Sequence, residues 1–350
     1  MTGVSHLTVG PGEGDLRLDR WLRRQFPHLA QAHIEKMCRK GEIRVDSARV
    51  KPATRLAEGQ HVRLPPIPAP LPQAAPAALR PAAVSAADAA MIRAAVLWQD
   101  ADMIALDKPP GLAVQGGSGT ERHVDALAAA LVGDGEEKPR LVHRLDRDTS
   151  GVLLLARSAR AAAALTRAFR DRETRKIYWA AVAGVPNPRM GTIRFGLVKS
   201  PGHGHSGENE KMRLVLPDKV DATEGAKRAT TDYAVLSALG RRAAWVALVP
   251  VTGRTHQLRA HMAGIGHPVV GDGKYGGSGQ ENQGDGWGAQ LGGEISRKLH
   301  LHARSLSFMH PFTGRRVHLV APLPVHMART WEMLGWAPGD APEDPFAEVS

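Results

Sequence analysis

The stretch from Leu141 to Arg157, LVHRLDRDTSGVLLLAR, places a carboxylate between two arginines, shortly before an apolar run. Asp146 stands between Arg144 and Arg147, and the polar turn DTSG joins it to the run VLLL. A short apolar run that begins with a β-branched residue and is bounded by glycine and arginine predicts a buried strand. Asp146 then lies on the loop that enters a core strand, which is a rigid mount for a reacting group. The plainer interpretation, an ion pair that caps a strand, explains the R-x-D triplet but not the whole stretch.

The length and the cysteine content limit the class of protein. A chain of 350 residues favours two domains over one. The single cysteine, Cys38, excludes an internal disulfide and a cysteine-based metal cluster, which fits a reducing cytoplasm. The N-terminus lacks the basic start and apolar core of a signal peptide, and no run approaches the ~18 apolar residues of a membrane span. We expect a cytoplasmic monomer with no membrane contact.

The positive charge is concentrated near the N-terminus. The whole chain carries 46 Lys and Arg against 35 Asp and Glu, a net charge of +11. Between Asp15 and Leu64 there are 12 Lys and Arg against 6 Asp and Glu, so this short segment holds about half of the excess. A polyanion, a membrane surface or a generally basic proteome can each explain a basic chain. The concentration in one small segment favours a nucleic acid.

The N-terminal segment has the pattern of a small α+β unit over 15–66, after a Gly-rich and flexible start over 1–14. Apolar residues at helical spacing predict a first helix from Asp15, and a second follows over about 32–40 with Gly41 as its C-cap. Strands are expected at 42–45 and 61–64. Basic side chains where the second helix ends and the next strand begins can meet phosphates in register, and these are Arg39, Lys40 and Arg44.

A Pro/Ala-rich segment over 67–90 predicts a semi-rigid linker, and a larger domain follows over 91–326. Its strands and helices do not alternate as βαβ units, so we expect an α+β fold with a mixed, largely antiparallel sheet. Mobile loops are expected at 200–210 and 276–293, and 327–350 is expected to form a C-terminal helix and a disordered acidic tail. The strands are expected around 104–106, 153–155, 178–182, 244–249 and 317–320.

Three further stretches carry polar groups suited to a site. LDKPPGLAVQGGSG (106–119) sets Lys108 before a proline turn and a Gly-rich loop, and RKIYWAAV (175–182) sets Tyr178 on a strand behind basic residues. PVTGRTHQLRAHMAGIGHPVVGD (250–272) holds Arg254, His256 and Arg259. Its three histidines raise the possibility of a metal, but they lack the i,i+4 pair of a zinc helix, and glycine and proline should break any helix here. We expect no metal.

Together these stretches resemble the RluA-type pseudouridine synthases, and the N-terminal unit resembles the S4 RNA-binding domain. The resemblance implies that specific uridines, most of all in large-subunit ribosomal RNA, are isomerised with no cofactor and no metal. It further implies that Asp146 is the catalytic nucleophile, that Arg259 pairs with it, that Tyr178 packs against the flipped base and is a candidate general base at C5, and that Arg144 fills the vacated stack. Substrate contacts are expected from Arg144, Arg147, Lys108, Arg254, His256, Arg39, Lys40 and Arg44.

Two other classes of protein stay open at this point. A non-catalytic S4-type RNA-binding or ribosome-assembly protein explains the charge, but it does not explain the stretches around Asp146, Tyr178 and Arg259. A retaining glycosidase also uses an attacking carboxylate, but it needs a second acidic partner, and no comparable acidic stretch stands out.

Overall fold

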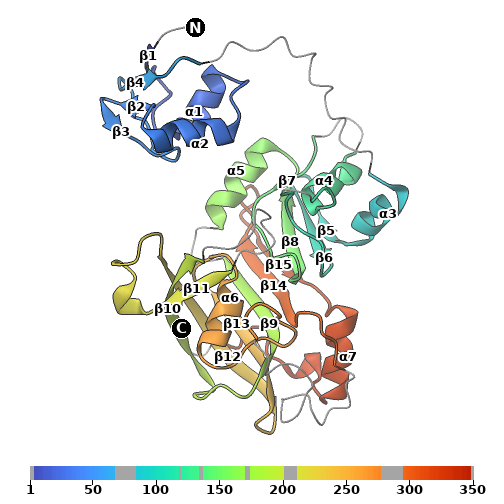
Figure 1. The fold of residues 1–350 in the computed structure, drawn as a ribbon. Helices are drawn as coiled ribbons and strands as arrows, with labels where there is room; N and C mark the ends of the chain where they lie inside the picture. Colours follow the sequence, from blue (N-terminus) through green and yellow to red (C-terminus); the bar gives the residue numbers. More distant parts are fainter. Residues whose placement is uncertain are drawn as a thin grey trace. The chain divides into compact units, whose positions relative to one another are not determined.

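The computed structural model describes residues 4–67, 84–117, 120–133, 137–169, 174–200, 211–276 and 295–347. The chain divides into two compact units, residues 1–82 and 83–350 (Figure 1). Most of the predicted linker and both predicted mobile loops lie outside the described residues. None of the described helices is long and apolar enough to cross a lipid bilayer.

The first unit packs two helices on a four-stranded antiparallel sheet with the strand order β1-β4-β2-β3. Gly41 ends α2 in the left-handed conformation at φ 72°, as its C-cap position predicts. Strand β1 corrects the expectation of a flexible start over 1–14, because it pairs with β4 and Val9 is buried. The elements are β1 (Ser5–Thr8), α1 (Leu18–Gln25), α2 (Gln31–Lys40), β2 (Arg44–Val45), β3 (Ala48–Arg49) and β4 (His61–Leu64).

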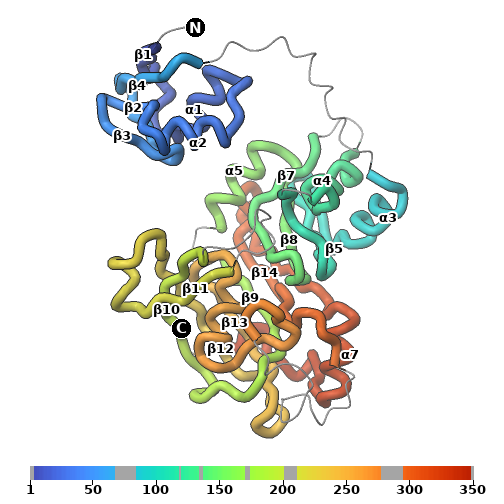
Figure 2. The backbone as a smooth tube through the Cα atoms, viewed as in Figure 1, coloured from blue at the N-terminus to red at the C-terminus, as the bar shows by residue number. Residues whose placement is uncertain are grey.

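The second unit is built on one mixed, largely antiparallel sheet of eleven strands, which confirms the predicted fold class. Figure 2 traces the path of the chain through this unit. The pair β14–β8 is parallel, and the other pairs are antiparallel. The main path runs β11 (Met212–Val215), β10 (Met190–Lys199), β12 (Lys227–Leu239), β13 (Ala243–Pro250), β9 (Arg175–Ala183), β14 (Leu301–Met309), β8 (Ser150–Ala156), β6 (Met103–Lys108) and β5 (Val96–Gln99). Off this path, β15 (Arg316–Val320) pairs with β14 and β7 (Arg140–Leu141) with β8.

Helices cover both faces of the central strands, which is why these strands are apolar on both sides. From α7 (Val325–Met333), Met327 and Trp331 pack on the odd-numbered residues of β9 and β13. From α6 (Gln257–Gly264), Leu258 and Met262 pack on the even-numbered residues. The remaining helices are α3 (Ala86–Ala94), α4 (Val124–Leu127), α5 (Ala159–Ala168) and the short 3-10 turns η1 (Ala128–Leu131), η3 (Pro217–Lys219) and η5 (Pro338–Asp340).

Strand β8 is the buried strand that the run VLLL predicts. Each of its residues from Ser150 to Ala156 is buried. Leu153 and Leu155 pack toward β6 and α4 on one face, while Val152 and Leu154 pack toward α5 on the other. The loop that carries Asp146 is therefore anchored to a fully buried strand.

Two boundaries differ from the sequence-based expectation. Helix α3 begins at Ala86, inside the predicted linker, with Ser85 as its N-cap and Ile92 in the core. At the other end, the tail is not disordered as far as residue 347. Phe346 is buried, and Asp344 accepts two 2.9 Å hydrogen bonds from Arg175 of β9.

Candidate active site

A cavity of about 1020 Å³ opens beside the Asp146 loop. Its lining comes from that loop, from the start of β9, from the end of β13 and from the start of α6. Five Lys and Arg line it, and Asp146 is the only carboxylate among the described residues that do so. Of the residues singled out from the sequence, it brings together Asp146, Tyr178, Arg259, Arg144, Arg254 and His256.

The Asp146 loop is held by the turn that follows β6. The N–H of Gly111 donates to the carbonyl of Arg147 at 3.0 Å, and the Nε of Arg147 donates back to the carbonyl of Gly111 at 3.2 Å. The N–H of Thr149 donates to the carbonyl of Asp146 at 3.2 Å and closes a turn before β8. These bonds fix the backbone on both sides of the carboxylate.

Lys108 does not lie where the substrate-binding hypothesis requires. It is fully buried, and its ammonium donates at 2.9 Å to the carbonyls of Pro109, Leu112 and Arg147. Burial lowers the pKa of Lys108 to about 7, while the nearby carboxylates, led by that of Asp148, and the three carbonyl acceptors favour the ammonium form. Lys108 therefore ties the proline turn to the Asp146 loop from inside the protein.

Arg259 faces Asp146 with one nitrogen and Asp272 with the other two. Its Nη1 lies 3.6 Å from Oδ2 of Asp146, which is the pairing that the family resemblance implies. Its Nε and Nη2 each donate to the carboxylate of Asp272 at 2.7 Å. Burial by itself would lower the pKa of Arg259, but the hydrogen bonds and the charge of Asp272 outweigh it and raise that pKa.

His256 lies on the other side of the carboxylate, with Nε2 4.0 Å from Oδ2 of Asp146. It stands just before α6 at φ 51°, a conformation that costs free energy in a non-glycine residue and is often found at functional sites. Its Nδ1 lies 3.1 Å from the hydroxyl of Tyr275, which also accepts the N–H of Met212 at 2.9 Å. Burial lowers the pKa of His256, with Arg259 adding to this effect and Asp146 opposing it.

These contacts favour one tautomer of His256. Burial raises the pKa of Tyr275 to about 12, so its phenol keeps its proton at neutral pH. Since the phenol oxygen accepts from Met212, the phenol proton is available for Nδ1 of His256. A neutral His256 then carries its own proton on Nε2, the nitrogen that faces Asp146.

Tyr178 is half-buried on β9 and lines the cavity. Burial raises the pKa of its phenol, and the negative charge of Asp146 raises it further. The phenol is therefore protonated at neutral pH, and in the sheet the residue lies opposite Leu248 of β13 on one side and Ala303 of β14 on the other.

The sequence interpretation of 250–272 was wrong about the backbone. A helix, α6, forms between Gly253 and Pro268. Gln257 holds the turn before it, since its Oε1 accepts from the hydroxyl of Thr252 at 2.7 Å and from the N–H of Arg254 at 3.1 Å. His261 is buried in this helix against Phe195, and His267 faces the carbonyl of Ala183, so the three histidines do not surround a common ion in the described structure.

Sequence reasoning missed Asp272, Tyr275 and Gln257. The one available signal was a charged residue, Asp272, one glycine after the apolar pair Val269-Val270. A carboxylate there needs a basic partner, but nothing in the spacing points to Arg259, thirteen residues earlier.

Arg39, Lys40 and Arg44 lie in the first unit, where all three side chains are exposed. Arg44 lies directly opposite Arg49 of β3 on one side and Arg63 of β4 on the other, and Arg63 lies opposite His6 of β1. This arginine row, made of Arg49, Arg44 and Arg63, crosses the outer face of the sheet, because the alternate residues Val45, Val62 and Leu64 are buried.

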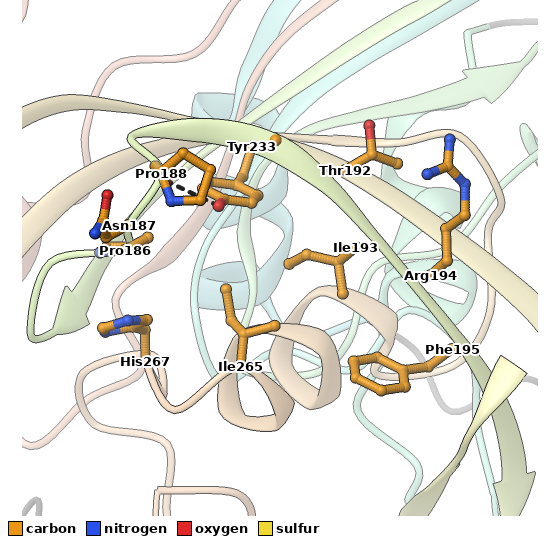
Figure 3. Close-up of a pocket in the computed structure, with 11 residues that line it drawn as sticks. Pro186, Asn187, Pro188, Thr192, Ile193, Arg194, Phe195, Tyr233, Ile265 and His267 are labelled. Atoms are coloured by element: carbon orange, nitrogen blue, oxygen red, sulfur yellow. Dashed lines mark hydrogen bonds between the residues drawn. The ribbon is translucent and has the colours of Figure 1, made fainter.

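Two other features of the second unit lie apart from this cavity. A smaller cavity of about 360 Å³ lies between the 186–188 turn, β10 and the end of α6, where the Tyr233 hydroxyl donates to the carbonyl of Pro188 (Figure 3). None of the residues proposed from the sequence lines it.

Asp100, Asp102 and His310 lie close enough to one another to share an ion. However, Nδ1 of His310 accepts two backbone N–H groups. Its proton is therefore on Nε2, which donates to Asp100 at 2.8 Å.

Comparison with known proteins identifies the family of this chain. Residues 102–264 match the family model described as RNA pseudouridylate synthase, and residues 16–62 match the S4 domain. The chain is 32% identical to the "Ribosomal large subunit pseudouridine synthase C" of Vibrio cholerae, over 93% of this chain and 95% of that protein. The chain belongs to the RNA pseudouridine synthase family. Members of this family are isomerases that convert uridine in RNA to pseudouridine.

Two further proteins show a similar sequence identity. The protein of the same description from Escherichia coli is 33% identical, over 95% of this chain and 97% of its own length. Among solved structures, "Human RNA Pseudouridylate Synthase Domain Containing 4" is 31% identical with a TM-score of 0.57, and the match covers 71% of this chain and 95% of that one. The pseudouridine synthase family is thus supported by sequence and by fold.

Proposed function

We propose that this enzyme isomerises specific uridines in large-subunit ribosomal RNA, in the cytoplasm, with Asp146 as the catalytic nucleophile. The observation that carries the proposal is the lining of the cavity, in which one carboxylate on a rigid loop faces five Lys and Arg. A retaining glycosidase would need two carboxylates in its site. A cationic cavity around a lone nucleophile instead fits a nucleotide within a phosphate backbone.

The proposed reaction breaks the N1–C1′ bond of the target uridine and forms a C5–C1′ bond after the base has rotated. The proton at C5 is lost and N1 gains one, so the product is an isomer. Asp146 acts at C1′, or by removing the 2′ proton on the way to a glycal. Arg259 at 3.6 Å favours the ionised carboxylate that either route requires.

The target base must leave its helical stack to reach Asp146, at a cost of about a few kcal/mol. In this proposal the ring of Tyr178 packs against the extruded base. Aromatic side chains commonly make such stacking contacts, and these contacts do not depend on which base is stacked. A phenol whose pKa is raised is a weaker choice for the base that removes the C5 proton. Packing is therefore the role that we assign to Tyr178.

The exposed arginines around the cavity supply the backbone contacts. Arg144 is exposed and precedes Asp146 by two residues, so it can enter the space that the base leaves. Arg254 is also exposed, and its Nε donates to the carbonyl of Arg228 at 3.3 Å, which steadies a cation at the cavity. Arg147 lies outside the lining and is assigned to the flanking RNA.

The first unit is proposed as the anchor for longer RNA. Like charges directly opposite in a sheet are unfavourable, yet Arg49, Arg44 and Arg63 stand side by side. A phosphate backbone would relieve this repulsion, and Arg39 and Lys40 at the end of α2 extend the basic surface.

The test is to map pseudouridine by sequencing in RNA from a strain that lacks this gene. We expect a defined set of large-subunit sites to lose pseudouridine, and the purified protein to restore them in the isolated RNA. An unchanged map, or modification in another RNA only, contradicts the proposed substrate.

A further inference from the structure

Asp272 is a second carboxylate in contact with Arg259, and it lies behind the cavity rather than in its lining. Its side chain has no exposed surface, and Arg259 keeps only 6% of its own. The two parallel 2.7 Å bonds form the bidentate fork geometry that orients a guanidinium most strongly. The direction in which Nη1 points is therefore set by Asp272.

The carboxylate of Asp272 is itself held by backbone. Its Oδ1 accepts the N–H groups of Lys274 at 3.0 Å and Tyr275 at 3.2 Å. The preceding Gly271 has φ 74°, and a Cβ there would lie 2.0 Å from the carbonyl oxygen of Lys298. Only glycine allows the chain to pass this close, so the 271–275 turn is built to place Asp272.

Asp272 also takes up the positive charge of Arg259. With His256 neutral, Asp146, Arg259 and Asp272 together carry one net negative charge. The 3.6 Å between Nη1 and Asp146 exceeds the ~3.2 Å limit of a normal N–H···O hydrogen bond, so the lone pairs of Asp146 are not used by the arginine. Without Asp272, the whole guanidinium fork would be free to pair with Asp146.

We propose that Asp272 is a positioning residue for the isomerisation, which holds Arg259 near Asp146 and prevents it from closing on the nucleophile. This inference rests on the proposed function. The other ionisable groups whose charge interacts with that of Asp146 are Lys108, Tyr178, His256 and Tyr275. A purely structural role for Asp272 would affect stability but would leave the response of Asp146 to pH unchanged.

The first experiment measures single-turnover rates at saturating RNA across pH for Asp272→Asn. Misplacement of Arg259 should lower the plateau rate about 10²-fold with RNA affinity unchanged. Because the uncompensated arginine favours the ionised Asp146, the acid limb of the profile should move to lower pH. Asp272→Glu restores the charge and should return the limb to its original position, even with a reduced rate.

The matched control is Asp100→Asn, which removes a carboxylate from His310 within the same unit but outside the cavity. It should leave both the rate and the acid limb unchanged. A wild-type rate in Asp272→Asn overturns the proposal. So does a lower rate whose acid limb stays in place.

The second experiment keeps the test valid if Asp272→Asn folds poorly. The double variant Asp272→Asn/Arg259→Met removes both buried charges and should melt at a higher temperature than Arg259→Met alone. If Asp272 acts through Arg259, the double variant should match the rate of Arg259→Met within about twofold. A further large loss shows that Asp272 acts independently. The melting temperatures report the pairing even if the wild-type protein makes no pseudouridine, an outcome that contradicts the proposed function alone.

Discussion

The ammonium of Lys108 donates a 2.9 Å hydrogen bond to the carbonyl of Arg147, the residue after Asp146. Two more carbonyls, those of Pro109 and Leu112, share the same buried nitrogen. The end of β6 and the loop that carries the proposed nucleophile are thus joined through one cation, which no solvent reaches.

Replacement of this cation should damage both stability and activity. Lys108→Met removes this donor from the carbonyls of Pro109 and Leu112 and leaves that of Arg147 with the N–H of Gly111. Since an unsatisfied buried acceptor costs about 1–3 kcal/mol, we expect the free energy of unfolding to fall by about 2–5 kcal/mol. The rate should fall because the Asp146 loop loses its support. Denaturant unfolding and single-turnover assays measure both effects. Lys138→Met, at a half-exposed pair with Asp125, should change neither, and equal effects of the two variants would contradict this role.

Asp146→Asn tests the nucleophile itself. The amide is nearly isosteric but cannot attack C1′ or remove a proton, so the rate should fall by ~10⁴ or more. Affinity for RNA, measured by filter binding, should stay within a few-fold. Substantial residual activity would remove Asp146 from its proposed role.

Arg259→Met should shift the pH dependence in a defined direction. The loss of Arg259 removes the positive charge 3.6 Å from Oδ2 of Asp146, and such a charge favours a negative carboxylate beside it. The acid limb should move to higher pH, and part of the lost activity should return as the pH is raised. A rate that is low but equally low at every pH would indicate that Arg259 positions RNA instead.

Tyr275→Phe tests the contact between the Tyr275 hydroxyl and His256. The variant removes the hydroxyl between His256 and the backbone of Met212, so we expect about a tenfold lower rate, the worth of about one hydrogen bond. RNA affinity should not change. Tyr233→Phe is the matched control, because its hydroxyl donates to Pro188 at 2.9 Å away from the cavity. Equal rates for the two variants would show that the Tyr275 contact does not serve the reaction.

The arginine row makes a prediction about salt. Replacing Arg44, Arg49 and Arg63 by Gln should weaken binding to long RNA and flatten the log–log salt dependence by about 0.7–0.9 per lost phosphate contact. The triple variant Arg20→Gln/Arg23→Gln/Arg24→Gln removes the same charge from exposed positions of α1. If both triples change the slope equally, net charge rather than the row accounts for binding. Turnover on a short stem-loop should be the same for both.

Local pattern was enough for several of these features. The apolar run after Asp146 predicted β8. All seven residues of this strand are buried, and a strand covered on both faces has a continuous apolar sequence in any fold. Gly41 predicted the end of α2 for an equally local reason, the left-handed C-cap. The family resemblance added the pairing of Arg259 with Asp146, which no spacing in the chain predicts.

Features that depend on partners far away in the chain could not be predicted from the sequence. Strand β1 has too few residues to show a period, and it exists because β4, more than fifty residues later, supplies its hydrogen bonds. The acidic tail is ordered through Asp344, whose partner Arg175 lies 169 residues earlier. Lys108 looked like a substrate ligand because a lysine in a Gly/Pro loop is normally exposed.

The sequence by itself determined the fold class, the basic N-terminal unit and the residue types available for chemistry, because these follow from composition, periodicity and motif. Only the tertiary structure decided how the charges are shared. In the folded protein, buried Lys108 donates to three carbonyls and Arg259 lies beside two carboxylates. His256 lies between Tyr275 and Asp146. The physical reason is that the state of a charge depends on the distance and the burial of every neighbour, and the chain acquires those neighbours only when it folds.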